Sequence, residues 1–407
     1  MYIQIAWRNI WRNPRRTAVI MTAIIIGIWS MIFLGSIMRG MEYNMIKNGI
    51  STLTGNIQIH QKDYRNDPTI ENSMSDPIYL ETVLTDVLPE VVKWTSRIRV
   101  NAIASNARHS SGITLVGINP IKEGRVSFIE QSINNGNYLD PENMQGIVIG
   151  QALLEKFVTK IGHKLILMSQ DTDGEIASRS FRIIGTFRSE LQATEKQFVF
   201  ITITAARQML KLSKGISEIS IVLDDNIDED HLADRLKAKL NANEYQVETW
   251  QDILPILKAY MELSNGFILI WFIVVFIAMG FGIVNTTLMA VFERMREFGL
   301  LKALGMKPWW IIRDVLLESF LLLVIGISIG NILSFISIFA LSQFGINLSA
   351  FAAGAEFSGI SRIIYPEFFI KDAVLSNMVV FILGLLVSLY PAVRAARFSP
   401  VEALTHT

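Results

Sequence analysis

Four long apolar segments constrain the fold of this chain more strongly than any other feature of its sequence. They cover residues 17–39, 264–292, 315–344 and 373–393, and each is long enough to cross the roughly 30 Å hydrocarbon core of a bilayer as a helix. Apart from Arg39 at the end of the first segment, their only charged residue is Glu318. Because a helix satisfies its own backbone hydrogen bonds in lipid, the segments predict four transmembrane helices.

Composition also indicates a membrane protein. Of the 407 residues, 51% are hydrophobic and 18% are charged, and the mean hydropathy is +0.37. Cysteine is absent, which excludes a disulfide framework and thiolate chemistry. The 37 basic and 37 acidic residues balance, but residues 40–263 hold 23 of the basic and 29 of the acidic ones, a net charge of about −6. The remainder is about +6, so we expect the two parts to face different environments.

Basic residues at the ends of the apolar segments predict the orientation, because Lys and Arg favour the cytoplasmic side. The segment ends on one side of the membrane are rich in Lys and Arg, and the ends on the other side contain few of these residues. We therefore expect both termini to be cytoplasmic in a bacterial inner membrane, with an uncleaved anchor as the first segment. The eleven residues on the basic side are Arg8, Arg12, Arg15, Arg16, Arg294, Arg296, Lys302, Lys307, Arg313, Arg394 and Arg397, against Arg39, Arg362 and Lys371 on the other.

The predicted fold class is a membrane protein with four transmembrane helices and a large extracytoplasmic α+β domain between helices 1 and 2. We expect a cytoplasmic interfacial helix at 1–16, the domain at 40–263, and a cytoplasmic loop with a short helix at 293–314. An extracytoplasmic loop is expected at 345–372 and a cytoplasmic tail at 394–407. The large domain would lie in the periplasm or outside the cell.

The 40–263 segment alternates strand-like and helix-like patterns. A period of two in the apolar residues predicts strands, and Glu229–Leu240 has helical spacing. An inserted subdomain is expected near 119–213. Apolar stripes continue beyond the end of span one and lead into the start of span two, which favours helical stalks over a pair of interfacial helices. The strand candidates are Asn56–His60, Ile113–Ile118, Ile147–Ile149, Lys164–Met168, Phe181–Ile184, Phe198–Ile201 and Ile219–Leu223.

Several function classes lack support in the sequence. With Glu318 near a membrane interface as the one ionisable group within the spans, ion relays of the kind transporters use are absent. The five His residues are widely spaced, and Asp171–Gly174 is only a fragment of a calcium loop, so no metal ligands are predicted. The stretch Gly299–Lys307 does not match a phosphate-binding loop. We therefore predict no catalytic, cofactor-binding or metal-binding residue.

The stretch Glu293–Met306 is a short charged segment with helical period between two spans. Phe298, Leu301 and Leu304 fall on one face, and charged residues fall on others. A charged helix in this place is poorly suited to catalysis and well suited to contact with a partner at the membrane surface. Pro308-Trp309-Trp310 follows it and favours the interface.

Two further segments have the character of interfacial anchors. At the N-terminus, Ala6, Trp7 and Ile10 form an apolar stripe beside arginines. After the last span, Tyr390–Leu404 predicts a basic helix end and a short turn. Both segments, and the charged helix, could instead serve only as headgroup anchors. The anchoring residues predicted are Trp7, Arg8, Arg12, Arg15, Arg16, Arg394 and Arg397.

Three motifs together resemble the FtsX-like family of ABC transporter permeases, which includes lipoprotein-releasing permeases, macrolide-exporter permeases and the cell-division permease. The motifs are Ala6–Ile10 with Pro14–Arg16, Glu293–Gly305, and Tyr390–Arg397 with Ser399–Leu404. The layout of one span, a large outer domain and three further spans also matches. Gly55–His60 and Val116–Pro120 are more similar to the lipoprotein-releasing branch.

The resemblance implies a dimer of permease subunits, homomeric or heteromeric, in the lipid bilayer, each docked to a separate cytoplasmic ABC ATPase that binds ATP and Mg. Motion of the charged helix would pass to the outer domain (mechanotransmission) for release of a lipoprotein or other lipid-linked cargo, with a periplasmic carrier or adaptor. Efflux of drugs or peptides and activation of a cell-wall hydrolase are alternatives, and no nucleic-acid partner is expected. The residues implied to couple to the ATPase are Glu293, Arg294, Arg296, Glu297, Gly299, Leu300, Leu301, Lys302, Ala303, Leu304, Gly305 and Met306.

Overall fold

The computed structural model describes residues 2–89, 91–189, 191–224, 227–347 and 363–398. They form two compact units. The helical unit comprises the described parts of 1–43, 260–350 and 363–407, and the sheet unit comprises the described parts of 44–259. Most of the predicted 345–372 loop, and the Ser399–Leu404 motif, lie outside the described residues.

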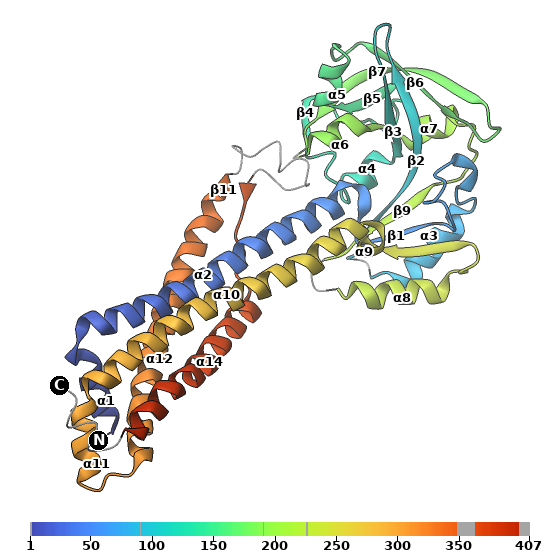
Figure 1. Cartoon of the computed structure of the whole chain (residues 1–407). Helices are drawn as coiled ribbons and strands as arrows, with labels where there is room; N and C mark the ends of the chain where they lie inside the picture. The colour runs from blue at the N-terminus through green and yellow to red at the C-terminus, as the bar shows by residue number, and fades with distance from the viewer. Residues whose placement is uncertain (1, 90, 190, 225–226, 348–362, 399–407) are drawn as a thin grey trace. The chain divides into compact units, whose positions relative to one another are not determined.

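Among the described residues, four helices are long and apolar enough to cross a membrane (Figure 1). Each contains one of the apolar segments found in the sequence, which confirms the expected fold class for the spanning part. Two shorter helices and a two-stranded ladder, β11 (Ile346–Asn347) with β12 (Ile363–Ile364), complete the helical unit. The helices are α1 (Tyr2–Arg12), α2 (Pro14–Gly49), α10 (Pro255–Glu293), α11 (Met295–Ala303), α12 (Pro308–Phe344) and α14 (Ile370–Arg397).

Small residues, Gly326 and Gly330, bring α12 against α2. A Cβ atom added at Gly326 would lie 2.6 Å from a methyl carbon of Ile24, and one at Gly330 would lie 2.9 Å from Ile28. Both distances are too short for any larger residue without a shift of the helices. The two glycines therefore permit the close approach by which helices pack in a bilayer, where apolar burial alone gives no net attraction.

Polar side chains add two links between the spanning helices. Asn331 of α12 and Asn377 of α14 exchange reciprocal amide hydrogen bonds of 3.0 and 3.1 Å. Arg39 of α2 binds Asp372 of α14 at 2.8 Å and Asn265 of α10 at 2.9 Å. Arg39 thus joins three helices with one guanidinium group, whose planar donors suit several acceptors at once.

The sheet unit contains a sheet of ten described strands in the order β10-β1-β9-β2-β3-β8-β5-β7-β4, with β6 pairing β2 and β7. Most neighbours are antiparallel, whereas β3–β8 and β5–β7 are parallel. The strands are β1 (Ile57–Gln61), β2 (Lys93–Ser105), β3 (Ser110–Ile118), β4 (Ile133–Gly136), β5 (Gly146–Gly150), β6 (Lys164–Gln170), β7 (Ile176–Phe187), β8 (Phe198–Thr202), β9 (Glu218–Val222) and β10 (Tyr245–Thr249).

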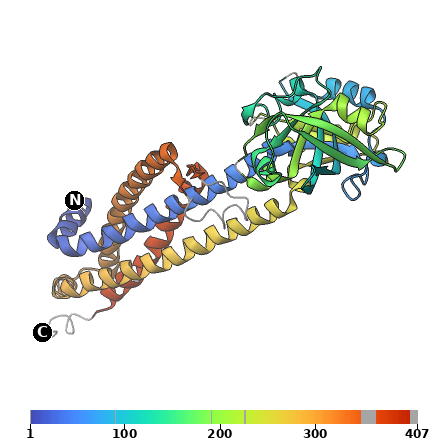
Figure 2. The same cartoon turned by 90° about the horizontal axis from the view of Figure 1, so that it is seen from above.

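Short helices cover the sheet, and the strand candidates named from the sequence coincide with β1, β3, β5, β6, β7, β8 and β9 (Figure 2). The predicted helix at Glu229–Leu240 is α8 (Glu229–Lys239). Strands β2, β4 and β10 were not predicted. The remaining helices are α3 (Pro77–Val87), α4 (Pro120–Glu123), α5 (Gln151–Lys156), α6 (Gln192–Gln197), α7 (Ile203–Met209) and α9 (Trp250–Ile253), with single turns at Ile50–Thr54 and Ile70–Asn72.

A fully buried arginine joins the sheet to the turn that follows α2. Arg97 on β2 makes a bidentate ion pair with Glu123 of α4, at 2.8 Å for the shortest contact, and a second with Glu218 of β9 at 3.2 Å. It also donates to the carbonyl of Leu53, a non-glycine residue with φ of 78°. Burial by itself lowers the pKa of Arg97, but the two carboxylates outweigh burial and leave the pKa above its ordinary value.

Replacing Arg97 with Met is expected to destabilise the protein by about 3–5 kcal/mol, because buried Glu123 would lose its counter-charge and Glu218 would keep only the more distant Arg99. The measurement is chemical unfolding of the full chain in detergent. Arg99→Met is the matched control, since Arg99 lies on the same strand with a third of its side chain exposed. Equal stability of the two variants would contradict this account, whereas partial rescue of Arg97→Met by Glu123→Gln would support it.

Candidate docking surface on the short charged helix

The charged segment of the sequence is α11, and both of its ends are defined by local chemistry. Arg294 breaks the helix after α10, and Gly305, with φ of 95°, ends α11. The amide of Met306 then donates to the carbonyl of Leu301, a closing bond typical of a glycine-terminated helix. Pro308 opens α12, where its missing N–H costs nothing. Figures 1 and 2 show α11 at the same end of the helical unit as α1.

Arg294 is the centre of an ion-pair network at the start of α11. Its guanidinium contacts Glu318 of α12 at 2.5 Å, Asp314 of α12 at 3.0 Å and Glu297 of α11 at 3.4 Å. It also lies over the ring of Phe298, with 4.8 Å to the centroid. Only 12% of the side chain is exposed, so these charges compensate one another inside the protein. Arg294 therefore couples α11 to α12.

The N-terminal helices contribute a second, more exposed set of ion pairs. Arg12 at the end of α1 contacts Glu297 at 2.6 Å, and Arg16 of α2 contacts Glu293 at 3.1 Å. Arg12 and Glu297 are both largely exposed, so their pair contributes about 1 kcal/mol or less, whereas the Arg16 side chain is mostly buried. These contacts orient the N-terminal helices against α10 and α11.

Lys302 links α11 to the end of α14. Its ammonium group donates to the carbonyl oxygens of Ala396, at 2.9 Å, and Phe398, at 2.6 Å. These carbonyls have no partner within the helix, and a cation stabilises the negative end of the helix dipole. An apolar cluster lies beneath these contacts and contains Val291, Phe298, Ile311, Val315, Ala392 and Ala395.

The outer side of α11 remains open and is largely apolar. Leu304 is 78% exposed, Leu300 is 55% exposed and Met306 is 37% exposed. A cavity of about 680 Å³ opens beside them. Its lining combines Ile5 of α1, residues at the end of α11 and the first turns of α12, namely Arg294, Phe298, Leu301, Leu304, Gly305, Met306, Lys307, Trp310, Ile311 and Asp314.

The structure divides the predicted coupling residues between two faces. The buried or half-buried ones are Arg294, Glu297, Gly299, Leu301 and Lys302, and the exposed ones are Glu293, Arg296, Leu300, Ala303, Leu304, Gly305 and Met306. Leu304 was expected on one face with Phe298, but Phe298 is buried and Leu304 is exposed, because the helix ends at Ala303. Of the predicted anchoring residues, Trp7, Arg8, Arg12, Arg15, Arg394 and Arg397 are exposed and Arg16 is half-buried.

Sequence reasoning missed four participants: Asp314, Glu318 in its role as a partner, and the carbonyls of Ala396 and Phe398. Asp314 and Glu318 are four residues apart and so share one face of α12, a signal that could have been found. The carbonyls could not have been found, because a backbone acceptor leaves no trace in the residue type. Among the described residues, no group of three or more His, Asp or Glu side chains could hold a metal ion.

The spanning helices and the large sheet unit between the first and second of them define a multi-pass membrane protein. Two family models place it more closely: the MacB-like periplasmic core domain matches residues 17–239, and the FtsX-like permease C-terminal domain matches residues 268–400. The chain therefore belongs to the FtsX-like ABC transporter permeases that carry a MacB-like periplasmic core domain.

Curated relatives agree with this family. The chain is 23% identical over 423 residues to the macrolide export ATP-binding/permease protein MacB of Escherichia coli (strain K12), covering 99% of this chain and 60% of the relative. It is 24% identical over 405 residues to MacB 2 of Yersinia pestis bv. Antiqua (strain Antiqua), covering 96% of this chain and 55% of the relative. The chain thus spans between 55% and 60% of the length of these relatives.

Two solved structures are similar to part of the chain. The periplasmic region of MacB from Actinobacillus actinomycetemcomitans has 15% identity and a TM-score of 0.37, covering 53% of this chain and 98% of that one. The extracellular domain of the noncanonic ABC-type transporter YknZ from Gram-positive bacteria has 14% identity and a TM-score of 0.33, covering 47% and 99%.

Replacing Arg294 with Met is expected to lower the free energy of unfolding by about 3–5 kcal/mol, because Glu318 and Asp314 would keep buried, unpaired charge. Thermal unfolding of the purified chain in detergent measures this. Arg296→Met, two residues along and exposed, serves as the matched control. The double variant Arg294→Met with Glu318→Met should recover part of the loss, and no recovery would count against a direct ion pair.

Proposed function

We propose that this chain is the permease subunit of an ABC transporter and that α11 receives motion from a separate cytoplasmic ABC ATPase, which binds ATP and Mg. The observation that carries the proposal is the division of α11 into two faces. One face is clamped by Arg294 and Lys302, and the other presents exposed Leu300, Leu304 and Met306 beside a cavity. A soluble partner that fills such a patch would remove apolar surface from water.

One face of α11 is held by Arg294 and Lys302. This supports the transmission of a movement of α11 to other helices instead of a local deformation of α11. A displacement of α11 would act on α12 through Arg294 and on α14 through Lys302, within one packed helical unit. Close-packed interiors respond to a push by shifting whole elements. The distribution of Lys and Arg supports an orientation in which α11 and both termini face the cytoplasm and the sheet unit faces outward.

We propose a dimer of permease subunits that releases or exports a lipoprotein or another lipid-linked cargo. The family supports dimerisation, and the Gly55–His60 and Val116–Pro120 stretches support the lipoprotein-releasing branch. Efflux of drugs or peptides with an adaptor is the second candidate, because the matched relatives are named macrolide export proteins.

Leu304→Asp is expected to weaken ATPase docking at least tenfold, because a charge would enter the centre of an apolar contact. The measurement is co-purification of the ATPase with the permease, together with ATP turnover of the complex. Ile176→Asp is the matched control, since Ile176 is an 81% exposed apolar residue of the sheet unit. Undiminished docking of Leu304→Asp would contradict the assignment of α11 as the docking helix.

The cargo can be tested with proteoliposomes that contain the permease, the ATPase and a fluorescent triacylated lipoprotein. We expect ATP-dependent transfer of the lipoprotein to a soluble carrier, and no transfer with Leu304→Asp. A parallel assay with a radiolabelled macrolide tests the second candidate. Macrolide transport without lipoprotein transfer would replace the first proposal with the second.

A further inference from the structure

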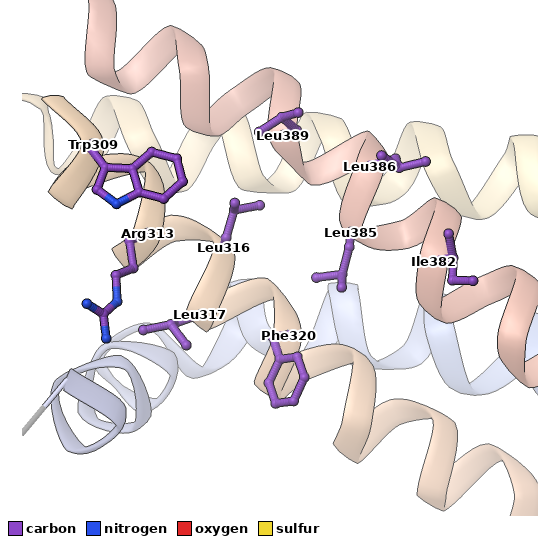
Figure 3. A pocket seen from close by; sticks show the side chains of 9 residues that line it. All are labelled: Trp309, Arg313, Leu316, Leu317, Phe320, Ile382, Leu385, Leu386 and Leu389. Atoms are coloured by element: carbon purple, nitrogen blue, oxygen red, sulfur yellow. The ribbon is translucent and has the colours of Figure 1, made fainter.

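A second cavity of the helical unit lies between α12 and α14, on the side away from the Arg294 network. Its volume is about 520 Å³, within the range of about 300–1,000 Å³ typical of small-molecule sites. Figure 3 shows large apolar side chains from both helices along its length: Leu316, Leu317 and Phe320 from α12, and Ile382, Leu385 and Leu386 from α14.

One end of this groove differs from the rest. Trp309 and Arg313, from the first turns of α12, line the same end of the groove as Leu389, with the Trp309 ring on the side of α14 (Figure 3). The Arg313 guanidinium also lies 5.4 Å from the centroid of the Trp310 ring. Tryptophan and arginine favour the headgroup level of a membrane, whereas the aliphatic remainder favours acyl chains. The lining of the groove is therefore apolar along its length, with Arg313 as its one charged residue at one end.

The lining also argues against a second protein helix as the occupant. Helices approach each other in a bilayer through small residues, as Gly384 does where it contacts Leu323. The groove instead presents exposed bulky side chains, with Leu386 at 57%, Ile382 at 49% and Phe320 at 40%. A flexible acyl chain can fill the space between such side chains, whereas a rigid helix cannot approach them closely.

We infer that the α12–α14 groove is a binding site for an anionic glycerophospholipid, with an acyl chain along the Leu386 wall and the phosphate group near Arg313. Anionic headgroups are favoured by the positive charge of the arginine, which gains from proximity to phosphate oxygens. The inference concerns this groove alone and does not rest on the docking role proposed for α11.

The test uses native mass spectrometry of the full chain, delipidated in detergent and titrated with either dioleoyl phosphatidylglycerol or dioleoyl phosphatidylcholine. We expect one tightly retained phosphatidylglycerol and weaker retention of phosphatidylcholine. Arg313→Gln should weaken phosphatidylglycerol binding about fivefold, a loss typical of one basic contact to an anionic lipid. Leu386→Trp should remove the site, because the indole would fill the groove.

Two controls keep the outcome interpretable. Arg397→Gln removes an exposed positive charge from the end of α14 outside the groove, and Phe281→Trp enlarges a 73% exposed side chain of α10. Both should bind phosphatidylglycerol as the parent chain does. If Leu386→Trp fails to purify as a folded protein, Ile382→Trp replaces it.

Three results would overturn the inference. Equal retention of the two lipids, with no effect of Arg313→Gln, would indicate non-selective solvation of an apolar surface. Unchanged phosphatidylglycerol binding in Leu386→Trp would place the lipid elsewhere. Loss of a dimer in Leu386→Trp, without a change in lipid retention, would identify the groove as a contact between two copies of the chain.

Discussion

The compensation of the Arg294 charge is the interaction on which the arrangement of the helical unit depends. Three carboxylates approach one guanidinium at the point where the chain leaves α10, turns into α11 and later passes down α12. Without the cation, Asp314 and Glu318 would repel each other near a low-dielectric region; without the acids, Arg294 would be desolvated alone. The network thus fixes the angle at which α11 leaves the membrane-spanning helices, and Lys302 fixes its other end.

The sheet unit also contains an arginine that is paired with several carboxylates near the end of a long helix. Arg97 holds the turn after α2 by binding Leu53, whose backbone conformation is unfavourable for a leucine, while two glutamates hold Arg97. In both units a long helix ends in a non-helical residue, and a nearly buried arginine binds several elements around that end. A nearly buried guanidinium group can take few positions, because each of its N–H donors needs a hydrogen-bond acceptor. The backbone therefore has one well-defined conformation at the point where each long helix ends.

Much of this architecture could be predicted, because apolar length and alternation are properties of single segments. The four spans and seven strands followed from these patterns. Strand β2 was missed although Ile98, Val100 and Ala102 alternate with polar residues, a signal that could have been found. The burial of Arg97 could not have been found, because its partners come from distant parts of the chain. The short helix α11 lies within the stretch predicted to be helical, but its faces differ from the prediction. The helical period extended to Leu304 placed it on one face with Phe298, whereas Gly305 ends the helix and leaves Leu304 exposed.

The reciprocal amide pair between Asn331 and Asn377 has a consequence for how α12 and α14 can move. Each amide has its matching donor and acceptor at one relative height of the two helices only. Sliding one helix along the other by a single turn, about 5.4 Å, would break both bonds and leave Asn331 with only its bond to the carbonyl of Ile327. Measured interhelical hydrogen bonds contribute about 0.6–2 kcal/mol, enough to favour one register without preventing separation. The pair therefore favours movements in which the two helices tilt together over movements in which one slides along the other.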